Sequence, residues 1–207
     1  MKMKNMAAFA FAALLSACGG TKVIDTDSAS AVKGMDNVME LEYRDWTKTS
    51  ERMLGSMLKS GSFAKVKNPV IAMGPMLNDT MQRFDTDILT KKIRTELLKS
   101  GQAQVATSFK GAAGAEDDST HRMRELRGNA EYDKGTIASK GTLVAPNMSL
   151  SGKMLQRNMR VEGGLLSRDK ERVEYYLQLT LTDLKTGLSV WEDEQPIIKE
   201  GKKAPRW

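Results

Sequence analysis

Residues 172–182 read Arg-Val-Glu-Tyr-Tyr-Leu-Gln-Leu-Thr-Leu-Thr, and this stretch decides the fold. Apolar and polar side chains alternate along it, so an extended strand would have one apolar face and one polar face. A turn sequence follows from Asp183 to Gly187, and Leu188 to Trp191 then returns as a partner strand. We therefore expect an antiparallel β-hairpin whose apolar face is buried against the rest of the domain.

Two longer helices are predicted upstream of this hairpin. Residues 46–60 carry apolar side chains at helical spacing, with Asp45 as the predicted N-cap. Residues 85–100 form the clearest predicted helix, because leucine and isoleucine recur every four positions and Gly101 follows the last turn. Ile88 and Leu98 are expected to add to the apolar face of this second helix.

The remaining elements are shorter, and together they define the fold class. We expect strands at 70–73, 102–109 and 148–154, a loop at 78–80, and short charged helices at 118–129 and 133–140. Helices precede and separate the strands, and a meander closes the chain. The predicted fold class is therefore α/β, as a single compact domain with a mixed sheet, flanking helices and a C-terminal meander.

The N-terminus has the features of an export signal. Lys2 and Lys4 form a basic head, an uncharged run follows, and Leu15-Ser16-Ala17-Cys18 resembles the bacterial lipobox, in which the cysteine is acylated after cleavage. The apolar run is shorter than the ~20 residues that span a bilayer. We expect a signal peptide at 1–17, a lipidated flexible tether at 18–37 and a globular domain with a basic tail at 38–207. The alternative is an ordinary signal followed by a cysteine without a role.

Composition limits the possible partners. The chain has 207 residues, a single cysteine and a formal net charge of +6, which falls to +4 when cleavage before Cys18 removes two lysines. A basic chain can bind nucleic acid, but an exported lipoprotein does not normally meet it, so we expect no nucleic-acid partner. Anionic partners in the cell envelope fit better. A solvated charge surplus without a function is the other interpretation.

Catalytic and metal-binding patterns are weak in this sequence. Ser56 and Ser62 are each followed three residues later by a lysine, and Lys185-Thr186-Gly187 matches a second motif of serine penicillin-binding enzymes. The third motif of that class is absent, and Gly187 is also explained by the hairpin turn. The single histidine, His121, is expected to be exposed on a charged helix. We predict no enzyme, no metal site and no cofactor.

A basic patch is the candidate binding site. Five cationic residues flank the glycine-containing loop at 162–170, and on a hairpin end they would suit an acidic protein surface or an anionic glycan. A solvated loop is the alternative interpretation. The five residues are Arg157, Arg160, Arg168, Lys170 and Arg172.

Several short strings, in this order and together with the lipobox, resemble the LpoB (YcfM) family over residues 40–198. The strings are Asp45-Trp46 at a helix start, the strand 70–73 followed by Asn78-Asp79-Thr80, the helix 87–100, the segments 141–146 and 150–153, and the hairpin 176–191.

The resemblance implies a function and a place in the cell. It implies a lipoprotein that binds and activates a class A penicillin-binding protein, and so regulates peptidoglycan and cell-wall synthesis without being an enzyme. It also implies a fold similar to the N-terminal domain of TolB. Gly19 and Gly20 follow Cys18 in place of the aspartate of an inner-membrane retention signal, so the expected location is the periplasmic face of the outer membrane, through an acyl (palmitate) anchor. We expect a monomer.

One departure from the family concerns the tether. Enterobacterial members have a long, proline-rich tether, whereas residues 19–37 contain no proline and are few. A structural lipoprotein of an envelope secretion or assembly complex is therefore the alternative function.

Overall fold

A computed structural model describes residues 39–109, 117–161 and 170–202. The side chains at 160, 161, 170 and 202 fall outside this description. The chain divides into two units, 1–36 and 37–207, and all described residues belong to the second unit. The predicted signal peptide, Cys18 and the whole of the predicted tether lie outside the described residues.

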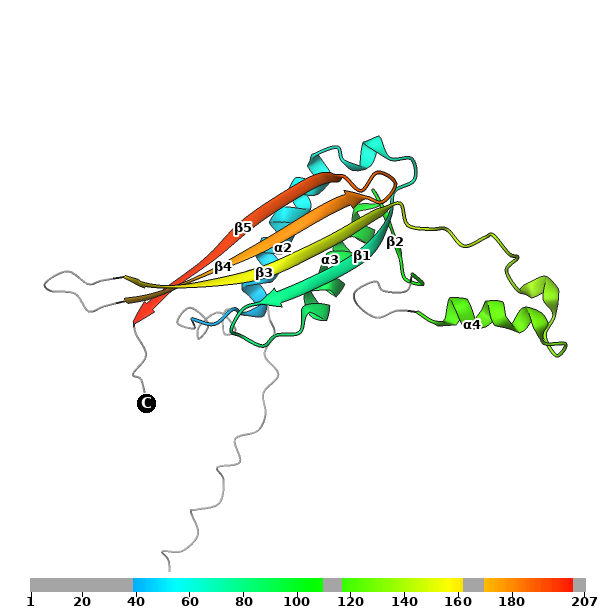
Figure 1. Ribbon diagram of the computed structural model, residues 1–207, viewed down its shortest axis with the longest axis horizontal. Helices are drawn as coiled ribbons and strands as arrows, with labels where there is room; N and C mark the ends of the chain where they lie inside the picture. The colour runs from blue at the N-terminus through cyan, green and yellow to red at the C-terminus, as the bar shows by residue number, and fades with distance from the viewer. Residues whose placement is uncertain (1–38, 110–116, 162–169, 203–207) are drawn as a thin grey trace, which may run out of the picture. The chain divides into compact units, whose positions relative to one another are not determined.

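The fold is a five-stranded mixed sheet with its two long helices on one face (Figure 1). The strand order is β2-β1-β3-β4-β5, with β1 parallel to β2 and β3, and the last three strands antiparallel. The predicted α/β fold class and C-terminal meander are therefore confirmed. The elements are α2 (Tyr43–Lys59), β1 (Val70–Asp79), α3 (Thr86–Ser100), β2 (Gln104–Ala106), α4 (Ser119–Glu125), β3 (Met148–Val161), β4 (Lys170–Asp183) and β5 (Ser189–Lys202).

The core lies between the helices and the sheet. The alternate residues of β4 that were predicted to be apolar are all buried, and they face a stripe of buried residues on α2 and α3. The hairpin is confirmed, because Leu181 pairs with Trp191 and Gly187 adopts φ 72° in the turn between the strands. The buried β4 residues are Val173, Tyr175, Leu177, Leu179 and Leu181.

Side-chain hydrogen bonds explain where α2 and α3 begin, and two predictions about these helices are corrected. Asp85 caps α3 by accepting a hydrogen bond from the Asp87 backbone N–H at 2.8 Å, as predicted. Asp45 is not the N-cap of α2, because that helix begins two residues earlier; it is the third helical residue and accepts from the backbone N–H of Glu42 at 2.9 Å. Ile88 and Leu98 do not join the apolar face, since they are 49% and 52% exposed.

Strand β1 is longer than predicted. The expected strand covered only the apolar run 70–73, but β1 continues to Asp79, so the predicted loop at 78–80 is wrong for its first two residues. A register shift between Met73 and Met76 accommodates the proline, which has no N–H to give to a neighbouring strand.

The segment between β2 and β3 is less regular than predicted. Strand β2 spans three residues instead of the expected 102–109. Helix α4 lies within the predicted range 118–129 and buries no residue. The helix predicted at 133–140 is wrong, because only a 3-10 turn forms at Lys134–Thr136. The physical reason is that Ile137 is the only side chain in this stretch that is buried, so no apolar stripe holds a longer helix.

Candidate functional site

The predicted basic patch lies at the end of the β3–β4 pair where β3 stops, at Val161, and β4 starts, at Lys170. Arg157 and Arg172 are fully described; Arg160 and Lys170 have described backbones only, and Arg168 lies outside the described residues. Arg157 pairs in register with Glu174, Arg160 with Glu171, and Arg172 with Met159 and Glu200. The strands therefore bring carboxylates next to the cations of the patch, an arrangement that sequence spacing did not reveal.

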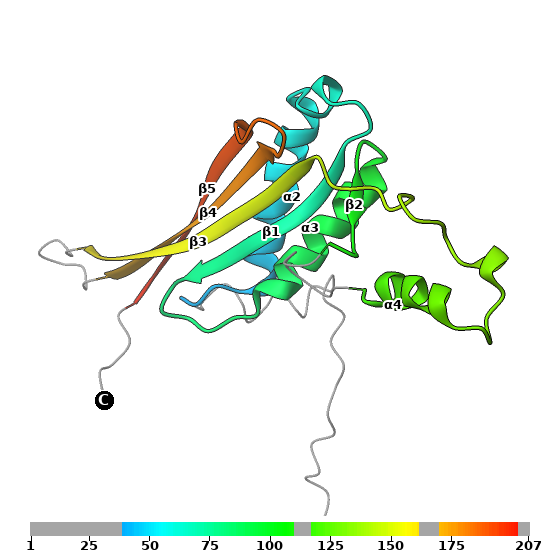
Figure 2. The ribbon, with the colours of Figure 1, turned by 45° about the vertical axis from the view of Figure 1, so that its right-hand side comes forward.

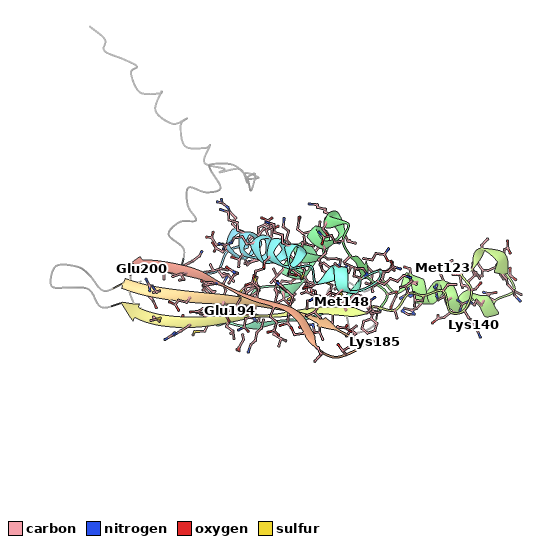
Figure 3. The ribbon with its side chains drawn as sticks, turned by 90° about the horizontal axis from the view of Figure 1, so that it is seen from above. Met123, Lys140, Met148, Lys185, Glu194 and Glu200 are labelled. Atoms are coloured by element: carbon pink, nitrogen blue, oxygen red, sulfur yellow. The ribbon has the colours of Figure 1, made fainter. Side chains whose placement is uncertain are left out.

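Arg157 and Arg172 lie on the sheet face opposite α2 and α3. Along β4 the buried apolar residues have odd numbers and point to the helices, so Arg172, Glu174 and Tyr176 belong to the other face. Figure 3 shows α2 and α3 on one side of the sheet, and no described helix covers the opposite side. We call this uncovered side the open face.

Two cross-strand ion pairs join charges on the open face. The Arg172 Nη2 atom is 3.1 Å from Glu200 Oε2, and Lys153 Nζ on β3 is 2.7 Å from Asp79 Oδ2 on β1. These exposed pairs contribute only ~0–1 kcal/mol each to stability. Their effect is to leave a surface of alternating charge instead of a continuous cationic one.

A buried carboxylate lies in the middle of this face. Glu174 is 8% exposed, and the Tyr176 hydroxyl donates to its Oε2 at 2.6 Å. This hydrogen bond is the main reason that the pKa of Tyr176 is raised, and the charge of nearby Arg157 opposes the rise. Tyr176 and Glu174 were missed as candidates, although both stood on the polar face of the alternating strand.

Apolar side chains surround this centre. Leu155 pairs with Tyr176, which pairs with Pro196, so the three form a row across β3, β4 and β5. Leu77 and Ile198 are 56% and 55% exposed on neighbouring positions. Aromatic, aliphatic and arginine side chains with paired charges are typical of a protein-binding surface.

The open face carries charges of both signs. Strand register places five basic and five acidic residues at positions on this face, so their formal charges cancel. They are Lys153, Arg157, Lys170, Arg172 and Lys202 against Asp79, Glu174, Glu192, Glu194 and Glu200.

The serine–lysine patterns have structural explanations. Ser62 is buried, and its hydroxyl lies 2.6 Å from that of Ser60 and donates to the Val190 carbonyl at 3.2 Å. Ser56 is exposed on α2, and no hydrogen bond joins either serine to Lys59 or Lys65 among the described residues. Lys185-Thr186-Gly187 forms the hairpin turn, where Asp183 accepts from the Lys185 N–H at 2.7 Å.

His121 and the acidic residues are the described side chains that could act as metal ligands. His121 is half-buried instead of exposed, because its Nε2 is 2.6 Å from the Ser108 carbonyl oxygen. Within the described ranges, no group of three or more His, Cys, Asp or Glu side chains gathers at a metal-binding distance. In the same ranges, no helix is both long enough and apolar enough to cross a membrane.

Comparisons with known proteins give one family and a set of similar structures. The family profile described as "Peptidoglycan-synthase activator LpoB" matches residues 45–197. No curated protein matches the chain in sequence. The LpoB C-terminal domain from Escherichia coli is 12% identical with a TM-score of 0.41, and the match covers 74% of this chain and 98% of that chain. The corresponding domain from Salmonella enterica is 15% identical with a TM-score of 0.44 and the same coverage.

Proposed function

This chain belongs to the LpoB family of peptidoglycan-synthase activators, and we propose that it is an outer-membrane lipoprotein that binds and activates a class A penicillin-binding protein. The observation that supports the proposal most is the family match itself. It runs from the start of α2 to Ile197 of β5, so it includes every helix and strand that forms the core. Activation then regulates cell-wall synthesis.

The chain acts by binding instead of by chemistry. The hydroxyl of Ser62 is held in structural contacts, and Ser56 has no lysine partner among the described residues. A non-catalytic partner can activate an enzyme by binding its active conformation more tightly than its inactive one. A preference of tenfold for the active state corresponds to about 1.4 kcal/mol.

A lipid on Cys18 would hold the domain at the periplasmic face of the outer membrane. The lipobox supports this part of the proposal, and so does the absence of aspartate at residues 19 and 20. The contact with the synthase is assigned to the basic end of the β3–β4 pair, with the open face beside it. The members of this contact are Arg157, Arg160, Arg168, Lys170 and Arg172.

The test measures glycan polymerisation by a purified class A synthase of the same organism. The added protein is the mature chain from residue 18 with Cys18→Ala, so that no lipid is needed for solubility. We expect a higher polymerisation rate and a complex in a pull-down. The double variant Arg157→Gln/Arg172→Gln should weaken the complex by about tenfold or more, since one lost contact of about 1.4 kcal/mol gives tenfold.

Lys153→Gln is the matched control for the double variant. Lys153 also takes part in a cross-strand ion pair on the open face, with Asp79, but it is outside the predicted patch. We expect it to bind and stimulate like the wild type. A wild-type chain that neither stimulates polymerisation nor forms a complex would refute the proposed function. An unchanged double variant would refute only the assigned contact.

A further inference from the structure

The outer side of the helix layer has a row of unpaired cations. Four basic residues of α2 recur at helical spacing on the side away from the core, and the acidic residue among them, Glu51, pairs with Lys92 of α3 at 2.9 Å. Three of the four are exposed, and no ion pair joins any of them to a carboxylate in the described part of the chain. They are Arg44, Lys48, Arg52 and Lys59.

Helix α3 extends this cationic surface. Lys91 is exposed and takes part in no described ion pair, and Lys99 is also exposed but contacts Glu96 at 3.0 Å. The acidic residues of the two helices are used mostly in the seam between them, where Lys92 contacts Glu51 at 2.9 Å and Glu96 at 3.6 Å. Because these carboxylates are paired where α2 and α3 meet, the outward sides of the two helices keep a positive charge. We call this side of α2 and α3 the basic helix face.

Apolar side chains are interspersed among the cations. Tyr43 and Ile88 are 45% and 49% exposed, and they line a shallow groove of about 550 Å³ between the start of α2 and α3. Lys91 and Lys99 lie along the same groove. A helical surface that combines lysine and arginine with exposed aromatic and aliphatic side chains is typical of binding at a membrane interface.

We propose that the basic helix face binds the surface of an anionic phospholipid bilayer. Two observations select this occupant. The first is charge: the face offers cations in two helical rows, which fit a layer of phosphate headgroups. The second is the place where the undescribed chain joins the domain. The described chain begins at residue 39, four residues before Tyr43, so the segment that would carry a lipid on Cys18 is joined to the domain just ahead of α2.

The bilayer contact adds a second signal to the lipid anchor. A single acyl chain alone holds a protein only marginally, whereas one chain with a polybasic surface holds it stably. Because the fully extended tether of ~20 residues reaches at most ~70 Å, the domain stays near the membrane that holds the lipid. On that surface it would lie with the helices towards the headgroups and the open face away from them.

The experiment uses vesicles and the mature chain with Cys18→Ala, so that neither the lipid nor a synthase takes part. We expect co-sedimentation with vesicles that contain phosphatidylglycerol, weak or no binding to pure phosphatidylcholine, and loss of binding at 1 M salt, where the Debye length is about 3 Å. The triple variant Lys48→Gln/Arg52→Gln/Lys91→Gln should bind about a hundredfold more weakly, from about 1 kcal/mol per cation near an anionic surface.

The matched control removes three exposed lysines elsewhere. Lys134, Lys140 and Lys185 lie outside α2 and α3, and Lys140 and Lys185 are labelled in Figure 3. Lys134→Gln/Lys140→Gln/Lys185→Gln should bind anionic vesicles within about threefold of the wild type. The proposal is overturned if the wild type ignores anionic vesicles, binds neutral ones equally well, or is affected equally by both triple variants. The vesicle-binding result would stand even if the protein failed to activate a synthase, because no synthase takes part in this experiment.

Discussion

At the residue scale, replacing glycine by alanine should have opposite effects on stability at Gly152 and at Gly55, because the surroundings of the two glycines differ. A Cβ atom on Gly152 of β3 would lie 2.7 Å from the Gln178 carbonyl oxygen, from Leu179 Cδ2 and from Met76 Sδ. Gly55, in the middle of α2, would meet nothing within 4 Å. The first glycine is required for close packing of β3 against β4, whereas the second only lowers the stability of its helix.

We expect Gly152→Ala to destabilise the domain by about 1–3 kcal/mol, the usual cost of overpacking. Gly55→Ala should stabilise it by about 0.5–1 kcal/mol, because alanine has the higher helix propensity. Urea unfolding followed by the fluorescence of buried Trp46 measures both changes. Equal effects of the two substitutions would show that the β3–β4 contact at Gly152 is looser than described.

At the scale of elements, the sequence was informative where a pattern repeats. Helix α3 and strand β4 were found because leucine and isoleucine recur every four positions in one and apolar residues every two in the other. Strand β1 was predicted only over its apolar run, residues 70–73, and its pairing with β3 up to Asp79 reveals that the strand continues. Periodicity could not show that Ile88 and Leu98 stay exposed.

The candidate surfaces were harder to predict, because the register between neighbouring strands decides which side chains lie side by side on them. The cations Arg157 and Arg172 could be selected from the sequence as a basic patch. Their carboxylate neighbours, Glu174 and Glu200, are 17 and 28 positions away, and only the β3–β4 and β4–β5 registers place them opposite. The basic row on α2 was present in the sequence at regular spacing, but the apolar stripe of the same helix was the stronger signal.

The segment that carries α4 should be dispensable for folding (Figure 2). Ile137 is its only buried apolar side chain, and it is not part of the main core cluster. Replacing residues 118–141 by about ten Gly-Ser residues, which span roughly 18 Å on average, should change the free energy of unfolding by less than about 2 kcal/mol. Urea unfolding measures this change, with Leu97→Ala as the destabilising control at about 2–5 kcal/mol. A collapse of cooperative unfolding in the replacement variant would contradict the prediction.

At the scale of the whole domain, charge is distributed unevenly between its two sides. Helices α2 and α3 together carry eight basic and four acidic residues, whereas the open-face positions of the sheet carry five of each. A domain that binds the membrane through its helices would present the sheet, with Tyr176 and the basic end of β3–β4, to a protein partner. The two proposed contacts therefore use opposite sides and can be made together.

If Cys18 carries the proposed lipid, the length of chain between it and α2 limits how far from the membrane the domain can act. With 24 residues between Cys18 and Tyr43, a fully extended segment would keep α2 within ~85 Å of that lipid, and a flexible one would keep it within roughly 25 Å on average. Cys18→Ala should yield a protein that carries no acyl group by mass spectrometry and that sediments with outer membranes less completely than the wild type. Its ability to stimulate a purified synthase should be unchanged, because the substitution leaves the folded domain intact. A native outer-membrane lipoprotein in the same extract serves as the internal control for fractionation. If the unacylated variant still sediments with outer membranes like the wild type, the anchor at Cys18 is not what holds the chain there, and the basic helix face or a protein partner must be sufficient.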